Sequence, residues 1–168
     1  MGTGIDASAA ARSWLKSIAW GGLLAGGLDI TAAFVIYGAR GATPVRILQS
    51  IASGLLGAAA FQGGPQTAAL GALLHFFIAL GAAAVYYAAA RKIGVLVGRP
   101  VVSGLLYGVA VYVFMNFLVL PLSAAPKRPF VLGMALLILV VHMVFVGLPI
   151  SLAVRRWAPL RPPAPAAP

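Results

Sequence analysis

Four long runs of apolar residues constrain this chain more than any other feature of its sequence. They cover residues 18–37, 68–90, 101–122 and 130–154. A helix needs about 20 mostly apolar residues to cross the roughly 30 Å hydrocarbon core of a bilayer, and each run reaches that length. The runs therefore predict an all-α membrane protein with four transmembrane helices in an antiparallel bundle. A head at 1–17 and a proline-rich tail at 155–168 flank this 18–154 domain.

The composition supports a membrane protein and excludes two soluble classes. Of the 168 residues, 62% are hydrophobic and only 8% are charged, whereas a soluble domain has roughly 45–50% apolar and about 25% charged residues. The formal net charge is +10, which in a soluble protein would indicate nucleic-acid binding. Here the basic residues lie between the apolar runs, as in the loops of membrane proteins. We therefore expect the lipid bilayer as a partner, no nucleic acid, and no soluble enzyme.

A fifth segment, residues 44–61, is apolar but too short and too polar for a full span. Its apolar core, 47–61, has about 15 residues and contains Gln49 and Ser53. The large aliphatic residues that share one helical face are Ile47, Leu48, Ile51, Leu55 and Leu56. This pattern predicts a short re-entrant or interfacial helix between the first two spans.

The basic residues alone do not decide between four and five spans. With four spans and a cytoplasmic N-terminus, eight basic residues lie in the cytoplasm and four outside. With five spans and an external N-terminus, the division is again eight to four. Because the positive-inside rule is tied, the short fifth segment decides. We expect four spans with both termini in the cytoplasm, and with Arg40, Arg46, Lys127 and Arg128 outside.

Small residues at helical spacing indicate where the helices pack. Lipid is as apolar as leucine, so membrane helices associate through close contacts of small residues rather than through hydrophobic burial. Gly22 and Gly26 form one Gly-x-x-x-Gly face, and Gly104 and Gly108 form another. We expect these glycines to pack helices together, either within one bundle, in a homo-oligomer or against other membrane proteins.

Four polar side chains interrupt the apolar runs near their centres: Asp29, His75, Asn116 and His142. At 1.5 Å rise per residue, each lies within roughly 10 Å of the middle of its span. An aspartate at the centre of a membrane helix costs about 2.5–3.5 kcal/mol to insert, so we expect Asp29 to face the bundle or a water-filled cavity. Because antiparallel helices keep mid-span residues at similar depth, the four residues form a candidate intramembrane polar site.

This polar site admits two interpretations. In the first, the chain is a small transporter or channel-like protein with a proton-sensitive site. Asp29 then accepts a proton, His75 or His142 relays it, and Asn116 orients one of them or contacts a substrate. In the second, the chain is an accessory or assembly subunit of a larger membrane complex, and the polar cluster only fixes helix register through hydrogen bonds.

We expect neither a metal nor a cofactor. His75 and His142 on antiparallel helices are the minimum for axial ligation of a haem, but no haem-attachment motif accompanies them. Two histidines and one aspartate also lack a local metal-ligand spacing such as His-x-x-x-His. The chain has no cysteine, which excludes thiolate chemistry. No nucleophile–base arrangement is visible, so we do not expect an enzyme.

Several segments resemble a family of uncharacterised bacterial multi-pass inner-membrane proteins. They are Pro44–Gly57, Ala60–Gly64, Leu74–Phe76, Tyr86–Tyr87, Tyr107–Gly108, Met115–Asn116 and Pro121–Ser123. The layout of residues 18–154 is similar to that of YagU-like proteins. This resemblance implies a location in the bacterial inner (cytoplasmic) membrane. It implies no established activity and transfers no catalytic residue to the chain.

Overall fold

The computed structural model describes residues 3–127 and 129–158, and these ranges contain helices and turns but no strand. The all-helical prediction is therefore confirmed. The elements are α1 (Thr3–Gly38), α2 (Pro44–Leu56), η1 (Gly57–Gln62), α3 (Gly64–Ala90), α4 (Val95–Gly98), α5 (Pro100–Phe114), η2 (Met115–Val119), α6 (Leu120–Leu122), α7 (Leu132–Val141), η3 (His142–Gly147) and α8 (Leu148–Trp157). Of these, η1 is a 3₁₀-helix, whereas η2 and η3 are π-helical turns.

Two prolines shape the last two long helices. The elements α5, η2 and α6 follow one another without a break, and so do α7, η3 and α8. Pro121 and Pro149 have no N–H to donate, and their rings would clash with the carbonyl four residues back. In η3, the N–H of Leu148 donates instead to the carbonyl of Met143, five residues back. The residue before Pro121 does the same in η2, and the wider π turns make room for the proline rings.

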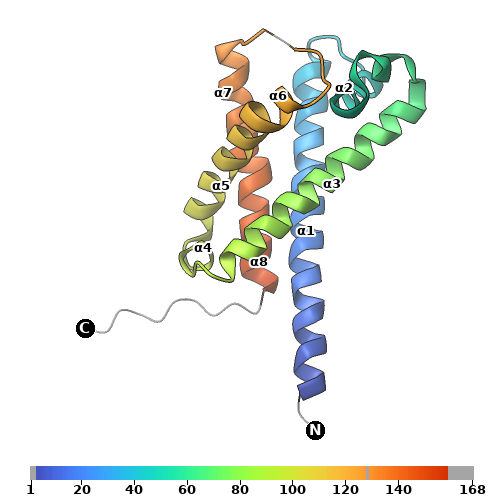
Figure 1. Ribbon diagram of the computed structural model, residues 1–168. Helices are drawn as coiled ribbons and strands as arrows, with labels where there is room; N and C mark the ends of the chain where they lie inside the picture. Colours follow the sequence, from blue (N-terminus) through green and yellow to red (C-terminus); the bar gives the residue numbers. More distant parts are fainter. Residues whose placement is uncertain (1–2, 128, 159–168) are drawn as a thin grey trace.

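The long helices alternate in direction along the chain (Figure 1). The start of α1 and the end of α8 therefore lie at the same end of the molecule, which we call the basal end. The opposite, apical end is where α1 ends and α3 begins. The first part of α1 extends beyond the other helices at the basal end. The head predicted at 1–17 is thus helical from Thr3 on, whereas tail residues 159–168 lie outside the described part.

The helices α2 and η1 lie at the apical end, beside the first half of α3 (Figure 1). A Cβ at Gly71 of α3 would overlap the carbonyl oxygen of Leu48, so the backbones of α2 and α3 touch there. Gln49 is only 4% exposed, and its Nε2 donates to the carbonyl oxygen of Gly64 at 3.1 Å. Gly57 and Gly64 have φ angles of 61° and 57°, a left-handed conformation that glycine adopts without strain.

Within the described residues, five segments are long and apolar enough to cross a membrane. Residues 44–62 of α2 and η1 form one of them, although the sequence indicated a segment too short and too polar for a full span. This segment differs from the other four in its geometry. The chain both enters and leaves it at the apical end (Figure 1). The N–H of Ala124 donates to the carbonyl oxygen of Gly54, which ties α2 to the apical loop before α7. The segment is therefore packed as an apical cap on α3.

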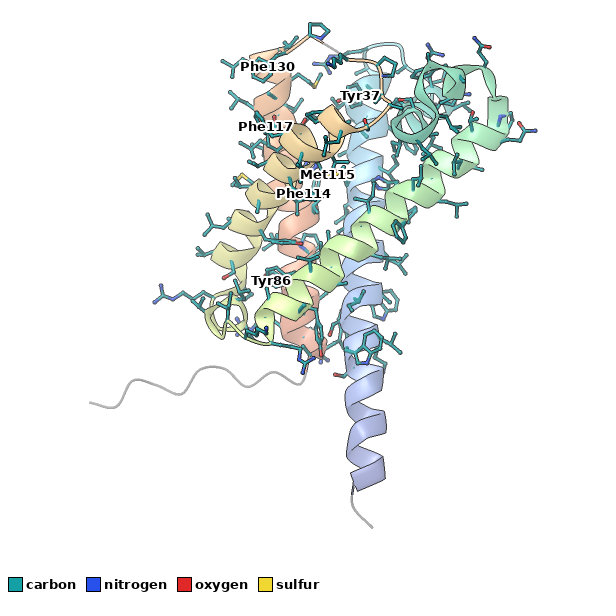
Figure 2. All side chains as sticks on the ribbon, in the orientation of Figure 1. Tyr37, Tyr86, Phe114, Met115, Phe117 and Phe130 are labelled. Atoms are coloured by element: carbon teal, nitrogen blue, oxygen red, sulfur yellow. The ribbon has the colours of Figure 1, made fainter. Side chains whose placement is uncertain are left out.

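Alanines, aliphatic residues and one tyrosine pack the interior of the bundle, whereas many large apolar residues face outward. The buried cluster consists of Ala25, Ala83, Tyr86, Ala90, Val97, Val146, Ile150 and Val154. Leu73, Phe77 and Phe117 are each at least 70% exposed, and Phe117 and Phe130 lie on the outside of the bundle (Figure 2). Soluble monomers rarely expose large apolar patches, whereas helices in lipid pack through small residues. The side-chain distribution therefore supports the interpretation as a membrane protein.

Candidate functional site

The side chain of Asp29 projects from the side of α1 that faces other helices. Asp29 lies one turn after Ala25 and Gly26. At about 100° per residue, its direction around the helix axis falls between theirs. Ala25 is fully buried, and Gly26 lies against Phe76 of α3. The Asp29 side chain is partly buried and forms no hydrogen bond or ion pair with any other residue that the structure describes. Its carboxyl group is therefore close to a packed interface but has no partner in that interface.

His75 joins α3 to the same stretch of α1. Its Nε2 lies 2.8 Å from the carbonyl oxygen of Gly26. Because a carbonyl can only accept, Nε2 carries the proton, and Nδ1 is the acceptor in the neutral ring. The ring of Phe76 meets His75 edge-to-face at 5.4 Å. The structure thus brings His75 within one helical turn of Asp29, but His75 binds the α1 backbone rather than the carboxylate.

Asn116 and His142 lie in the two π turns, on the other pair of helices. Asn116 donates from Nδ2 to the carbonyl oxygen of Tyr112 at 2.9 Å. His142 donates from Nδ1 to the carbonyl oxygen of Ile138 at 2.9 Å. The rings of Tyr112 and His142 meet edge-to-face, with centroids 5.7 Å apart. Tyr112 therefore links the two predicted residues, although each makes its hydrogen bond within its own helix.

The four predicted polar residues thus form two pairs. Asp29 and His75 lie at the contact of α1 with α3, and Asn116 and His142 lie at the contact of α5 and η2 with η3. Within the described residues, no side-chain hydrogen bond joins the pairs. Towards the apical end α3 diverges from α5, so the second pair is carried away from α3 (Figure 1).

The predicted packing glycines lie at the closest helix contacts. A Cβ at Gly22 would be 2.8 Å from Leu80 Cα in α3, and one at Gly26 would be 2.9 Å from the Phe76 ring. In α5, Gly104 and Gly108 face η3 and the start of α8; a Cβ at Gly104 would be 2.9 Å from Leu148 Cα. The first contact holds His75 against α1.

Gly147 is a packing residue that the sequence did not single out. A Cβ at this position would overlap the carbonyl oxygen of Gly104 and the backbone of Gly108. A Cβ at Gly108 would in turn overlap the carbonyl oxygen of His142. These contacts bring α5 against η3, which places Tyr112, one turn after Gly108, beside the His142 ring. The absence of a matching glycine four residues away explains why Gly147 carried no sequence signal.

A second group of polar contacts closes the basal end. Tyr86 is 1% exposed, and its hydroxyl donates to the carbonyl oxygen of Leu96 in α4 at 2.9 Å (Figure 2). The hydroxyl of Tyr107 donates to the carbonyl oxygen of Ala82 at 2.7 Å, and the two tyrosine rings meet at 4.9 Å. Ser151 donates to the carbonyl oxygen of Pro100. These side chains join α3, α4, α5 and α8, and the partner of Tyr86 depends on the path of α4.

The haem hypothesis requires His75 and His142 to present ring nitrogens to one iron atom. In the structure, His75 Nε2 already donates to Gly26, and His142 Nδ1 donates within its own helix. The two residues also belong to different pairs. Among residues 3–127 and 129–158, no group of three histidine or acidic residues is placed to hold a metal ion.

Comparisons with known protein families, with characterised proteins and with solved structures found no match to this chain. The resemblance to YagU-like inner-membrane proteins therefore stays a prediction.

Proposed function

We propose that the chain crosses the bacterial inner (cytoplasmic) membrane four times, through α1, α3, α5–η2–α6 and α7–η3–α8, with both termini in the cytoplasm. The apical position of both ends of the 44–62 segment supports four crossings over five. The charges support the orientation. Among the described residues, seven basic residues lie towards the basal end (Arg12, Lys16, Arg91, Lys92, Arg99, Arg155 and Arg156) and three towards the apical end (Arg40, Arg46 and Lys127). By the positive-inside rule, the basal end is cytoplasmic.

We further propose that the protein is a small transporter or channel-like protein with a proton-sensitive site at Asp29 and His75. The observation that carries this proposal is that Asp29 is partly buried and its carboxyl group has no partner among the described residues. Its insertion costs about 2.5–3.5 kcal/mol. A carboxyl group that only fixed helix register would form a hydrogen bond across the interface. An unpaired group remains available to a proton or a cation.

The geometry of His75 fits a relay to this carboxyl. With Nε2–H held by Gly26, the neutral ring has Nδ1 available to accept a proton. A proton that passes from the His75 imidazolium to the Asp29 carboxylate leaves a neutral ring and a neutral acid. Because the two groups form no direct ion pair, a water molecule would have to bridge them.

The π turns at Asn116 and His142, which accommodate Pro121 and Pro149, are compatible with this proposal. Such turns occur often at functional sites, and interrupted helices line the binding sites of many transporters. The His142 ring lies beside Tyr112, and its Nε2 forms no hydrogen bond with any described residue.

Proton flux into liposomes tests the proposal. The purified protein is reconstituted with a pH-sensitive dye inside, and a potassium diffusion potential drives proton entry. We expect flux with the wild type and Asp29→Glu, and loss of at least tenfold with Asp29→Asn. Thr31→Val is the matched control, because Thr31 is exposed on the same helix and donates only to Gly27. Equal flux in Asp29→Asn and wild type, or none in either, would contradict the proposal.

A second variant separates the relay from the packing role of His75. His75→Gln keeps an N–H that can donate to Gly26 but cannot carry a proton at physiological pH. If His75 relays protons, this variant folds with normal stability and loses flux. If His75 only packs α3 against α1, flux is unchanged.

The alternative function is an accessory subunit of a larger membrane complex. The observation in its favour is that Asn116 and His142 each donate a hydrogen bond within their own helix, as structural residues would do. Asp29 would then pair with a basic residue of another membrane protein. Purification in mild detergent distinguishes the two functions, because a stoichiometric membrane partner that Asp29→Asn releases would favour the subunit.

A further inference from the structure

A groove at the basal end lies outside the proposed polar site. It is formed by the last turns of α3, by α4 and by the first two turns of α5, and its volume is about 410 Å³. Ala89, Val102 and Leu106 supply apolar walls. Arg99, just before α5, lines the same groove and is exposed. One cation therefore stands at the basal end of a surface that is otherwise almost entirely apolar.

Hydrogen bonds hold the groove in shape and also satisfy its polar groups. The Tyr86 hydroxyl donates to Leu96 and the Tyr107 hydroxyl to Ala82, at 2.9 and 2.7 Å. The hydroxyl of Ser103 donates to the carbonyl oxygen of Val95 at 3.3 Å. Because these hydroxyls are committed to backbone carbonyls, they are already satisfied before any ligand arrives. The groove thus offers a preformed surface suited to a hydrocarbon chain.

The charges around the groove favour an anion. None of its lining residues is acidic, and Arg91 and Lys92 lie on the exposed turn that leads into α4. Ile93 and Val95, beside these cations, are about half exposed. This combination of exposed apolar and basic residues is typical of a segment at the lipid headgroups. The planar guanidinium of arginine suits the oxygen atoms of a phosphate group.

We propose that this groove binds one anionic phospholipid, with an acyl chain against Ala89, Val102 and Leu106 and the phosphate on Arg99. At 1.5 Å rise per residue, Arg99 and Leu106 are roughly 10 Å apart along α5. This length accommodates the upper part of an acyl chain that runs parallel to the helix. Arg99 lies at the basal end of α5, near the other basal cations. The phosphate of the lipid therefore points to the basal end, and its acyl chain runs along α5.

Native mass spectrometry with defined lipids tests the site. The protein is reconstituted from equal amounts of phosphatidylglycerol and phosphatidylcholine, released in mild detergent, and the retained lipids are counted. We expect one phosphatidylglycerol per chain in the wild type and in Arg99→Lys. Arg99→Gln should lower the preference for phosphatidylglycerol about fivefold, the effect of one interfacial cation. Arg156→Gln is the matched control, because Arg156 is exposed at the same end and does not line the groove.

A change in the groove wall separates a site from general charge attraction. Leu106 is 64% exposed, so Leu106→Trp fills the groove without disturbing the core. We expect it to abolish retention of the lipid. Equal losses of preference in Arg99→Gln and Arg156→Gln would overturn the proposal, and so would full retention in Leu106→Trp. A dimer crosslinked through Leu106→Cys, without retained lipid, would assign the groove to a second copy instead.

Discussion

Replacement of Gly22 by alanine tests the packing that positions the candidate site. A Cβ at Gly22 would lie 2.8 Å from both Cα and Cδ2 of Leu80, whereas ordinary contacts begin near 3.4 Å. The Cα atom cannot rotate away, so α1 and α3 must separate by about 0.6 Å. Overpacking of this kind destabilises proteins by about 1–3 kcal/mol. Gly27→Ala is the control on the same helix, because a Cβ at Gly27 meets nothing within 4 Å.

The same displacement reaches the polar site. The hydrogen bond from His75 to Gly26 lies one turn beyond Gly22 and is 2.8 Å long. A separation of about 0.6 Å would stretch it beyond the usual range of roughly 2.7–3.2 Å. With only two histidines in the chain, ¹⁵N spectra of labelled protein resolve the His75 ring directly. We expect Gly22→Ala to shift its Nε2 resonance and Gly27→Ala to leave it unchanged.

Unfolding in mixed detergent micelles measures the stability difference. Trp20 and Trp157 stack at 6.1 Å across α1 and α8, so tryptophan fluorescence reports on loss of the bundle. We expect Gly22→Ala to unfold at lower denaturing-detergent fraction, equivalent to about 1–3 kcal/mol, and Gly27→Ala to match the wild type. If both alanine variants are as stable as the wild type, the close contact of α1 with α3 is wrong.

Three further predictions concern other parts of the fold. Tyr86→Phe removes the hydrogen bond to α4 and should lower the stability of the protein by about 0.6–1 kcal/mol. Tyr87→Phe should leave stability unchanged, because the Tyr87 hydroxyl has no partner among the described residues. Equal melting temperatures of the two variants would contradict this prediction. Gly71→Ala should push α2 away from α3. The thiol of Gln49→Cys should therefore react faster with maleimide in the Gln49→Cys, Gly71→Ala double variant than in Gln49→Cys alone. In oriented vesicles, Lys16→Cys and Lys92→Cys should react with an impermeant maleimide from one side of the membrane. Arg40→Cys and Lys127→Cys should react from the other side. Labelling of Lys16→Cys and Arg40→Cys from the same side would refute an α1 crossing.

Hydropathy predicted the bounds of the helices well because residues that a membrane helix excludes, such as arginine, lie at their ends. The run that starts at residue 101 is preceded by Arg99 and Pro100, and α5 begins at Pro100. Residues 44–61 were expected to be too short for a span, yet residues 44–62 are long and apolar enough for one. The structure places them at the apical end, with Gln49 buried against Gly64. The N-terminal extension of α1 was not predicted, since polar and charged residues interrupt residues 3–17 and leave no long apolar run there.

The arrangement of the polar residues could be predicted only in part. Depth follows from counting residues along a helix, but direction depends on rotation about the helix axis. The π turns before Pro121 and Pro149 change that rotation at the residues of interest, Asn116 and His142. Periodicity therefore could not show that the four residues form two pairs. The partner of Tyr86 was equally hidden, because it is a backbone carbonyl set by the path of α4.

Asp29 should face water within the membrane, and thiol modification measures this accessibility. The chain has no cysteine, so Asp29→Cys carries a single reactive group. We predict that a small charged methanethiosulfonate modifies Asp29→Cys in vesicles, while Leu73→Cys, on the outward face of α3, stays unmodified. A folded Asp29→Cys protein that resists the reagent from both sides, under conditions in which Arg40→Cys reacts fully, would contradict the account.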